Sequence, residues 1–135
     1  MREILFRGKS ACGAWVRGDL INRKIWHSEF QVIRTDDSGF DNYTEYEVIT
    51  DTVGQYTGLT DKNGKKIFEG DIVEGLFRFH LPVNSVVAYS EGSFGLLWDR
   101  GGVETFWAFP TICNVEYEVI GNIHDHPELL KGGEG

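Results

Sequence analysis

The sequence predicts a mainly β protein of the small barrel or sandwich type. Apolar and polar residues alternate along many short runs, which is the pattern of half-buried strands. These runs are rich in Val, Ile, Phe, Tyr and Trp, and the chain's seventeen glycines separate many of them. The strand candidates are residues 3–7, 14–21, 25–34, 45–50, 71–79, 84–89, 94–98, 103–109 and 115–120.

Two of these runs show the alternation most clearly. Within residues 25–34, Trp26, Phe30 and Val32 fall on one face of a strand, and polar side chains fall on the other. Within residues 115–120, apolar residues alternate with two glutamates that should point to water. We therefore expect each run to form one strand with a buried face.

Turns and one short helix complete the predicted elements. Residues 61–65 contain Asn63-Gly64, a pair that tolerates positive φ and can close a tight hairpin. Residues 35–42 are the most loop-like stretch, and residues 90–93 form another turn. Pro and Glu at the start of residues 127–131 suit the first turn of a helix, which would be only about one turn long.

Size and charge limit the classes of function. The 135 residues fit one domain, or two small subdomains that share a core. The 13 basic residues face 21 acidic ones, and the net charge of −8 opposes binding to nucleic acid and to anionic membranes. No apolar run approaches the length of a membrane span or a signal peptide, so we expect a cytoplasmic protein.

The two cysteines, Cys12 and Cys113, form no Cys-x-x-Cys motif, so the sequence contains neither a zinc knuckle nor a redox pair. In the cytoplasm both thiols should be reduced, although a disulfide between them is possible in principle. Cys113 is more typical of a packed small apolar residue than of a nucleophile.

The most metal-like cluster is His124-x-His126, which Asp125 and Glu128 flank. No distant residues complete a four-ligand zinc site, so a polar turn before the terminal helix is favoured. Asp61-x-Asn63-Gly64 resembles only the start of a calcium loop and lacks the other acidic ligands. We therefore expect no metal and no cofactor.

Glu69, Asp71 and Glu74 are close in sequence, so an acid–base pair of carboxylates is one interpretation of them. Closeness in sequence does not place carboxylates across a cleft, which such chemistry requires. Asp71 is better explained as a residue that holds a turn through hydrogen bonds to the backbone. The sequence therefore contains no catalytic constellation, and we expect a protein without enzymatic activity.

The aromatic residues admit two explanations. Trp26, Trp98 and Trp107 would suit a stacking platform for bases or sugars, but core filling is favoured because few basic residues accompany them. The alternative function is a barrel that binds single-stranded nucleic acid. Its candidate contact residues are Phe77, Arg78, Phe79, Trp98 and Arg100.

Three segments resemble one known family. They are residues 2–9 (REILFRGK) with 15–20 (WVRGDL), residues 52–73 (TVGQYTGLTDKNGKKIFEGDIV) and residues 117–130 (YEVIGNIHDHPELL). Together they are similar to the YopX family, small proteins encoded by bacteriophages and prophages. The resemblance covers nearly the whole chain, and the second segment is the most specific.

The resemblance implies a β-rich fold with a barrel-like part over about residues 1–60 and an SH3-like part over about residues 61–135. The family has no established activity, so no catalytic, cofactor-binding or metal-binding residue can be carried over. In the shared segments the glycines should supply turns or close backbone approach, Tyr56 and Phe68 should be buried, and Pro127 and Leu129 should fix the terminal turn.

These observations lead to one expectation and one alternative. We expect an uncharacterised accessory protein of a phage or prophage that acts through contacts with a protein partner or through self-association. The alternative is the single-stranded nucleic-acid-binding barrel. The identity of a partner and the oligomeric state do not follow from the sequence.

Overall fold

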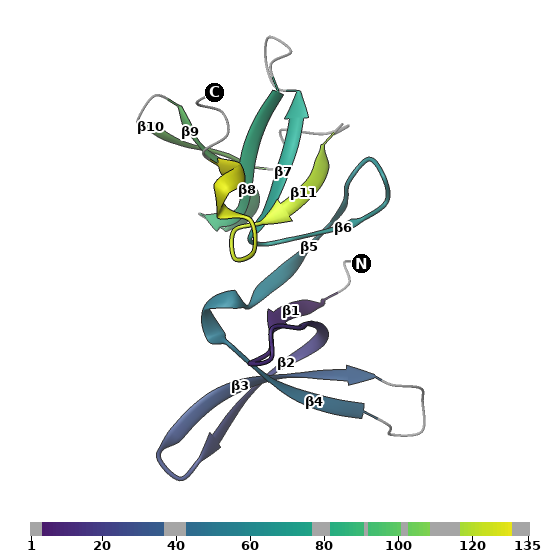
Figure 1. The fold of residues 1–135 in the computed structure, drawn as a ribbon, viewed down its shortest axis with the longest axis vertical. Coiled ribbons are helices and arrows are strands. Elements are labelled where there is room, and N and C mark those ends of the chain that lie inside the picture. Colours follow the sequence, from purple (N-terminus) through teal and green to yellow (C-terminus); the bar gives the residue numbers. More distant parts are fainter. Residues whose placement is uncertain are drawn as a thin grey trace. The chain divides into compact units, whose positions relative to one another are not determined.

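The computed structural model describes residues 4–36, 43–76, 82–90, 92–100, 103–108 and 117–130 (Figure 1). The chain divides into two compact units, Met1–Tyr56 and Thr57–Gly135. Antiparallel strands dominate both units, which confirms the predicted mainly β fold. Among the described residues, no helix is long and apolar enough to cross a membrane.

The first unit is an antiparallel meander (Figure 1). Its strands are β1 (Phe6–Lys9), β2 (Trp15–Ile25), β3 (Ser28–Asp36) and β4 (Tyr43–Val48), followed by a 3-10 turn, η1 (Thr50–Thr52). The next strand, β5 (Gly54–Thr60), runs through the boundary between the units, and its first two residues pair with β1.

The meander of the first unit folds back on itself without closing. The strand order of the sheet is β4-β3-β2-β1-β5-β6, which is open, and its last strand, β6 (Lys66–Phe68), belongs to the second unit. One bridge, Ser10↔Val48, and the hydrogen bond from Ile49 N–H to the Lys9 carbonyl (2.8 Å) link the end of β1 to the end of β4. Among the described strands, the expected barrel-like part is therefore a curled, open sheet. One bridge stands where a closed barrel would have a continuous ladder of backbone hydrogen bonds.

The core of the first unit lies where β1, β3 and β4 meet. Ile33 is fully buried, and Val32 and Val48 are nearly so. Gly8 permits this packing, because a Cβ at that position would lie 3.0 Å from the Val48 Cβ. The strands can approach closely here only because β1 carries no side chain at this point.

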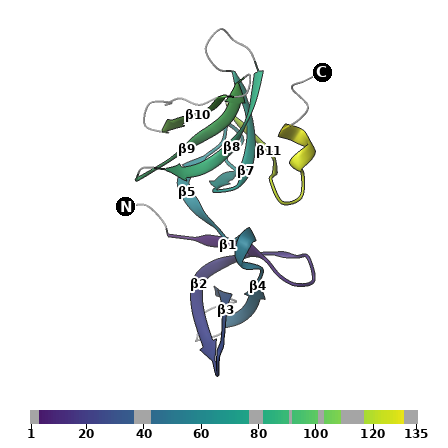
Figure 2. The same ribbon diagram turned by 90° about the vertical axis from the view of Figure 1, so that its left-hand side faces the viewer.

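The second unit contains β6 (Lys66–Phe68) and a five-stranded antiparallel sheet. The sheet strands are β7 (Asp71–Leu76), β8 (Pro82–Ser90), β9 (Ser93–Arg100), β10 (Val103–Ala108) and β11 (Glu118–Asn122). Their order is β10-β9-β8-β7-β11, and Figure 2 shows β8 between β7 and β9. Seven buried side chains form its core: Ile67, Val73, Val87, Phe94, Leu96, Tyr117 and Val119.

The turn between β5 and β6 confirms the predicted hairpin. Gly64 has φ +82°, and nothing lies within 4 Å of the position of a Cβ there. Asp61 Oδ1 accepts hydrogen bonds from the N–H groups of Asn63 (2.8 Å) and Lys65 (2.9 Å). Asp61 Oδ2 accepts a third from Val119 N–H (3.0 Å), so one buried carboxylate ties the turn to β11.

Other predicted structural roles in the shared segments are confirmed. Tyr56 and Phe68 are buried. Asp71 is buried at the start of β7, and its Oδ2 accepts a hydrogen bond from Phe68 N–H (2.7 Å). Asp71 therefore holds a turn, as the sequence predicted.

The C-terminal helix is a 3-10 turn, η4 (Pro127–Leu130), and not an α-helix. Four residues cannot sustain an α-helical hydrogen-bond ladder, so contacts with the sheet hold the turn. Asn84 Nδ2–H on β8 donates to the Leu129 carbonyl (2.9 Å). A Cβ at Gly121 would lie 2.9 Å from Leu129 Cδ1, which shows how closely η4 packs on β11.

Two predictions about residues 25–34 are wrong. The run is not one strand, because Trp26 and His27 form the turn between β2 and β3. Trp26 is not in the core either, since 89% of its surface is exposed, whereas Val32 is buried. The alternating pattern continued through the turn, so it gave no sign of the chain reversal. Most of the predicted loop over residues 35–42 lies outside the described residues.

Candidate interaction site on the β2–β3 hairpin

The five residues of the nucleic-acid alternative are not brought together by anything that the structure describes. Phe77, Arg78 and Phe79 lie outside the described residues. Trp98 and Arg100 are on β9, where their backbones pair with Thr105 and Val103 of β10. Trp107, on β10, pairs with Leu96. The backbone register therefore places Trp98 and Arg100 on β9, and it does not relate them to the other three candidate residues.

The other candidate residues from the sequence have structural roles. His126 Nδ1 accepts a hydrogen bond from Asn122 N–H (3.3 Å), and Asn122 Oδ1 accepts from His124 N–H (3.0 Å) and Asp125 N–H (2.9 Å). This cluster is a hydrogen-bonded turn before η4. Within the described parts of the chain, no group of three His, Cys, Asp or Glu side chains is arranged to hold a metal ion.

Cys12 is free and exposed, and Cys113 lies outside the described residues. The Cys12 Sγ lies 3.0 Å from Ser10 Oγ. Hydrogen bonding to Ser10 and to the backbone of Ala14 lowers the pKa of the Cys12 thiol.

The tip of the β2–β3 hairpin is the most unusual exposed feature of the first unit. Ile25 pairs with Ser28, so the turn contains only two residues, Trp26 and His27. Trp26 has φ +59° and is the only described non-glycine residue with positive φ. Glycine is the usual residue in such a conformation, because a side chain costs about 1–2 kcal/mol there.

The chain therefore displays an indole ring at a position where the backbone favours glycine. Trp26 is 89% exposed, and its neighbour Ile25 is 54% exposed. Arg23 and Lys24 precede them, so two cationic side chains lie close to the apolar tip in the sequence. Exposed aromatic rings beside cations are typical of contact surfaces.

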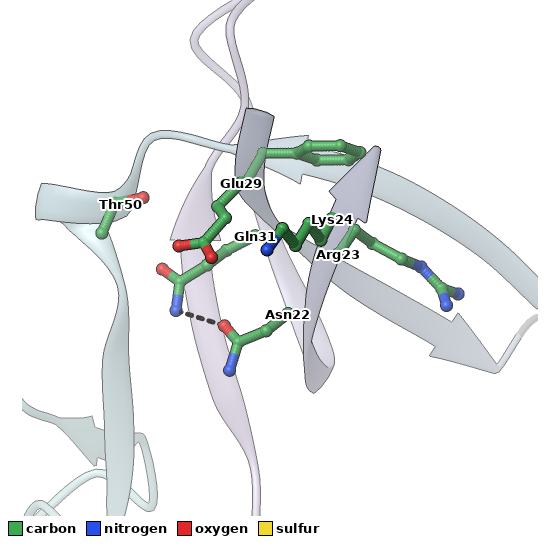
Figure 3. A pocket seen from close by; sticks show the side chains of 7 residues that line it. Asn22, Arg23, Lys24, Glu29, Gln31 and Thr50 are labelled. Carbon is green, nitrogen blue, oxygen red and sulfur yellow. Dashed lines mark hydrogen bonds between the residues drawn. The ribbon is translucent and has the colours of Figure 1, made fainter. Parts of the chain in front are cut away.

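A groove begins beside this tip, and we call it the hairpin groove. Its volume is about 520 Å³, within the usual range for ligand sites. Figure 3 shows the side chains that line it. The lining residues are Asn22, Arg23, Lys24, Glu29, Phe30, Gln31 and Thr50.

One face of the hairpin supplies the polar floor of the groove. Asn22 pairs with Gln31 across the strands, and Lys24 pairs with Glu29. Gln31 Nε2–H donates to Asn22 Oδ1 (3.0 Å), whereas the buried Gln31 Oε1 has no hydrogen-bond partner. In Figure 3 the Lys24 and Glu29 side chains extend over the same face, and the Arg23 guanidinium points away from them.

On the opposite face of the hairpin, ion pairs between side chains link neighbouring strands. Glu45 Oε2 on β4 accepts hydrogen bonds from Arg34 (2.8 Å) on β3 and from Arg23 on β2. These two guanidiniums lower the pKa of Glu45, and Glu45 raises the pKa of Arg34. The Arg34 guanidinium also lies 4.2 Å from the centre of the Tyr43 ring. This network joins three strands through one carboxylate oxygen of Glu45.

The hairpin site combines charged and amide side chains with an exposed aromatic ring at its tip. The described lining of the groove comprises one carboxylate, one ammonium group, one guanidinium, two amides, one hydroxyl and one phenyl ring. Sequence reasoning missed this site because the turn contains no Gly, Pro, Asn or Asp. The available signal was the cluster of Arg23, Lys24 and Trp26, which is too common on strands to mark a turn.

Comparisons with known proteins identify a family and a similar fold for this chain. None of the curated proteins compared with the chain matches it. It is similar to the solved structure titled "Crystal structure of protein EF1440 from Enterococcus faecalis", with a TM-score of 0.57 and 23% sequence identity. This similarity covers 96% of the chain and 99% of that structure, and at this identity it shows the fold alone. The family described as YopX protein matches residues 5–131, so the chain belongs to the YopX family.

Proposed function

We propose that this protein is a non-enzymatic accessory protein of a phage or prophage that acts in the cytoplasm by binding a protein chain through the tip of its β2–β3 hairpin. The observation that carries the proposal is Trp26, which is 89% exposed and has positive φ. A buried aromatic ring is often a major source of affinity at protein interfaces, so an exposed ring on a two-residue turn suits an anchor.

The lack of enzymatic activity is supported by the chemistry of the described residues. The acidic groups with shifted pKa values, Glu45 and Asp61, are held by arginines and by backbone N–H groups. Neither lies in the hairpin groove, and the groove itself contains only one carboxylate. The phage or prophage origin and an SH3-like second unit are further parts of the proposal, and the family resemblance is their support.

A protein partner is favoured over nucleic acid by the net charge of −8, which opposes phosphate binding. The alternative would use Phe77, Arg78, Phe79, Trp98 and Arg100 to bind single-stranded nucleic acid. A fluorescence titration with short single-stranded DNA at low salt tests it. Tight binding that weakens steeply with salt would replace the protein-binding proposal.

The proposal is tested by protein capture with a matched pair of variants. Trp26→Gly removes the ring and suits the positive φ, so it should melt at the parent's temperature or above it. Ile4→Ala removes another strongly exposed apolar side chain, 68% exposed, from the same unit. The full chain is immobilised and exposed to an extract of a lysogenic host, and its self-association is measured in parallel.

We expect the parent and the Ile4→Ala variant to bind a protein, either from the host or a second copy of the chain. The folded Trp26→Gly variant should lose that binding. Equal binding by the Trp26→Gly variant and the parent would refute the role of the hairpin tip. A parent chain that binds no host protein and does not self-associate would refute the proposed function.

A further inference from the structure

We infer that the chain that docks at the hairpin is a second copy of this protein, in a two-fold arrangement where each Trp26 enters the hairpin groove of the other copy. The inference rests on the proposed function and names the partner of the same site. Three features of the first unit support it: the position of the groove, the charges along it, and an amide oxygen that lacks a donor.

The groove lies beside the ring that would fill it. Lys24 and Glu29, two of its lining residues, are two and three positions from Trp26 along the hairpin. A volume of about 520 Å³ accommodates an indole ring. Lys24, whose side chain extends over the groove face in Figure 3, supplies a cation that attracts an indole. Because ring and groove share one hairpin, a two-fold axis can bring both pairs together at once.

The charges beside the tip are self-complementary. Lys24 and Glu29 are cross-strand neighbours on the groove face, and neither makes an ion pair with another described residue. A two-fold rotation between two hairpins places each Lys24 opposite the Glu29 of the other copy. This arrangement forms two equivalent ion pairs and brings no like charges together, as an isologous interface requires.

The side-chain amide oxygen of Gln31 lacks a hydrogen-bond donor. This Oε1 is buried, and such an acceptor lowers stability until a donor reaches it. Glu29 lines the same groove, but its carboxylate is an acceptor and cannot satisfy this oxygen. The indole Nε1–H of the incoming Trp26 is only a donor. It can donate to Gln31 Oε1 when Glu29 turns toward Lys24 of the second copy.

The contact should be weak, because two hairpin tips bury less surface than the roughly 1,200 Å² of a stable interface. Two buried indoles and two rim ion pairs are consistent with dissociation constants on the order of micromolar. We therefore expect an equilibrium between monomer and dimer that depends on concentration, with a dimer that is weakened by high salt.

The experiment is sedimentation velocity of the full chain over a wide range of concentrations. The parent and Ile4→Ala should dimerise alike, and Trp26→Gly should remain monomeric. The Lys24→Glu chain places two negative side chains at the groove, and the Glu29→Lys chain places two positive ones. Each alone should dimerise at least about tenfold more weakly than the parent.

An equimolar mixture of the two charge variants should restore the dimer, now as a heterodimer, because both contacts between positions 24 and 29 then join a Glu to a Lys. Failure of the mixture to associate would refute the two-fold charge pairing. A parent chain that stays monomeric at every concentration would overturn the inference. If that monomer still binds a host protein through Trp26, the proposed function stands and only the second copy is excluded as partner.

Discussion

Replacement of Asp61 by Ala tests the turn that ties β5 and β6 to β11. The Asp61 carboxylate accepts hydrogen bonds from the backbone N–H groups of Asn63, Lys65 and Val119. The Val119 N–H is buried, and losing its acceptor costs about 1–3 kcal/mol. The other two N–H groups belong to exposed residues and regain water, so each loss costs about 0.5–1 kcal/mol. We expect Asp61→Ala to lower the free energy of unfolding by about 3 kcal/mol in total.

Asp61→Asn is the matched control because it keeps the shape and one acceptor oxygen. Its amide nitrogen would face the Val119 N–H, so we expect about half of the loss. Urea denaturation followed by circular dichroism measures both variants, and amide hydrogen exchange at Val119 reports the lost bond directly. An Asp61→Ala variant within about 0.5 kcal/mol of the parent would show that this network does not stabilise the second unit.

The pH dependence provides an independent check. Burial acts to raise the pKa of Asp61, but hydrogen bonds from Val119, Lys65 and Asn63 together lower the pKa below its usual value. The carboxylate therefore stabilises the folded state above the ordinary aspartate pKa of about 3.9, and this stabilisation is lost as pH falls through the folded pKa. The stability difference between the parent and Asp61→Asn should shrink in that acidic range.

Three further changes test other features. Gly64→Val should lower stability by about 2 kcal/mol in thermal melting, because a β-branched residue must adopt φ +82°, whereas Gly64→Asn should cost much less. Gly121→Ala should loosen η4 and speed amide exchange at His126, because its Cβ would lie 2.7 Å from His126 Nδ1. Glu45→Gln should lower the melting temperature slightly at low salt and less at high salt, and a salt-independent loss would refute an electrostatic role.

Sequence patterns predicted the parts of the fold that depend on local backbone preference. Asn63-Gly64 marked a turn because these residue types tolerate positive φ, and Gly64 has it. The alternation of apolar and polar residues over residues 115–120 predicted that Tyr117 and Val119 are buried, and both are. Asp71 was identified as a turn residue for the same local reason, namely a short carboxylate side chain near its own backbone.

The candidate site could not be predicted because its turn contradicts local preference. Trp26 has positive φ, where glycine or asparagine is expected, so no turn signal was present. Long-range contacts were equally inaccessible. The hydrogen bond between Asp61 and Val119 joins residues 58 positions apart, and the Ser10↔Val48 bridge depends on how the whole meander curls. No period in the sequence encodes either contact.

The exposure of Trp26 has a practical consequence, because it makes this side chain an intrinsic optical reporter. An indole that is 89% exposed is accessible to small ionic quenchers in water. Transfer of this ring into an apolar pocket would shift its emission to shorter wavelengths and protect it from those quenchers. The difference spectrum between the parent and Trp26→Gly isolates this one fluorophore among four tryptophans, so occupation of the hairpin can be followed without any attached label.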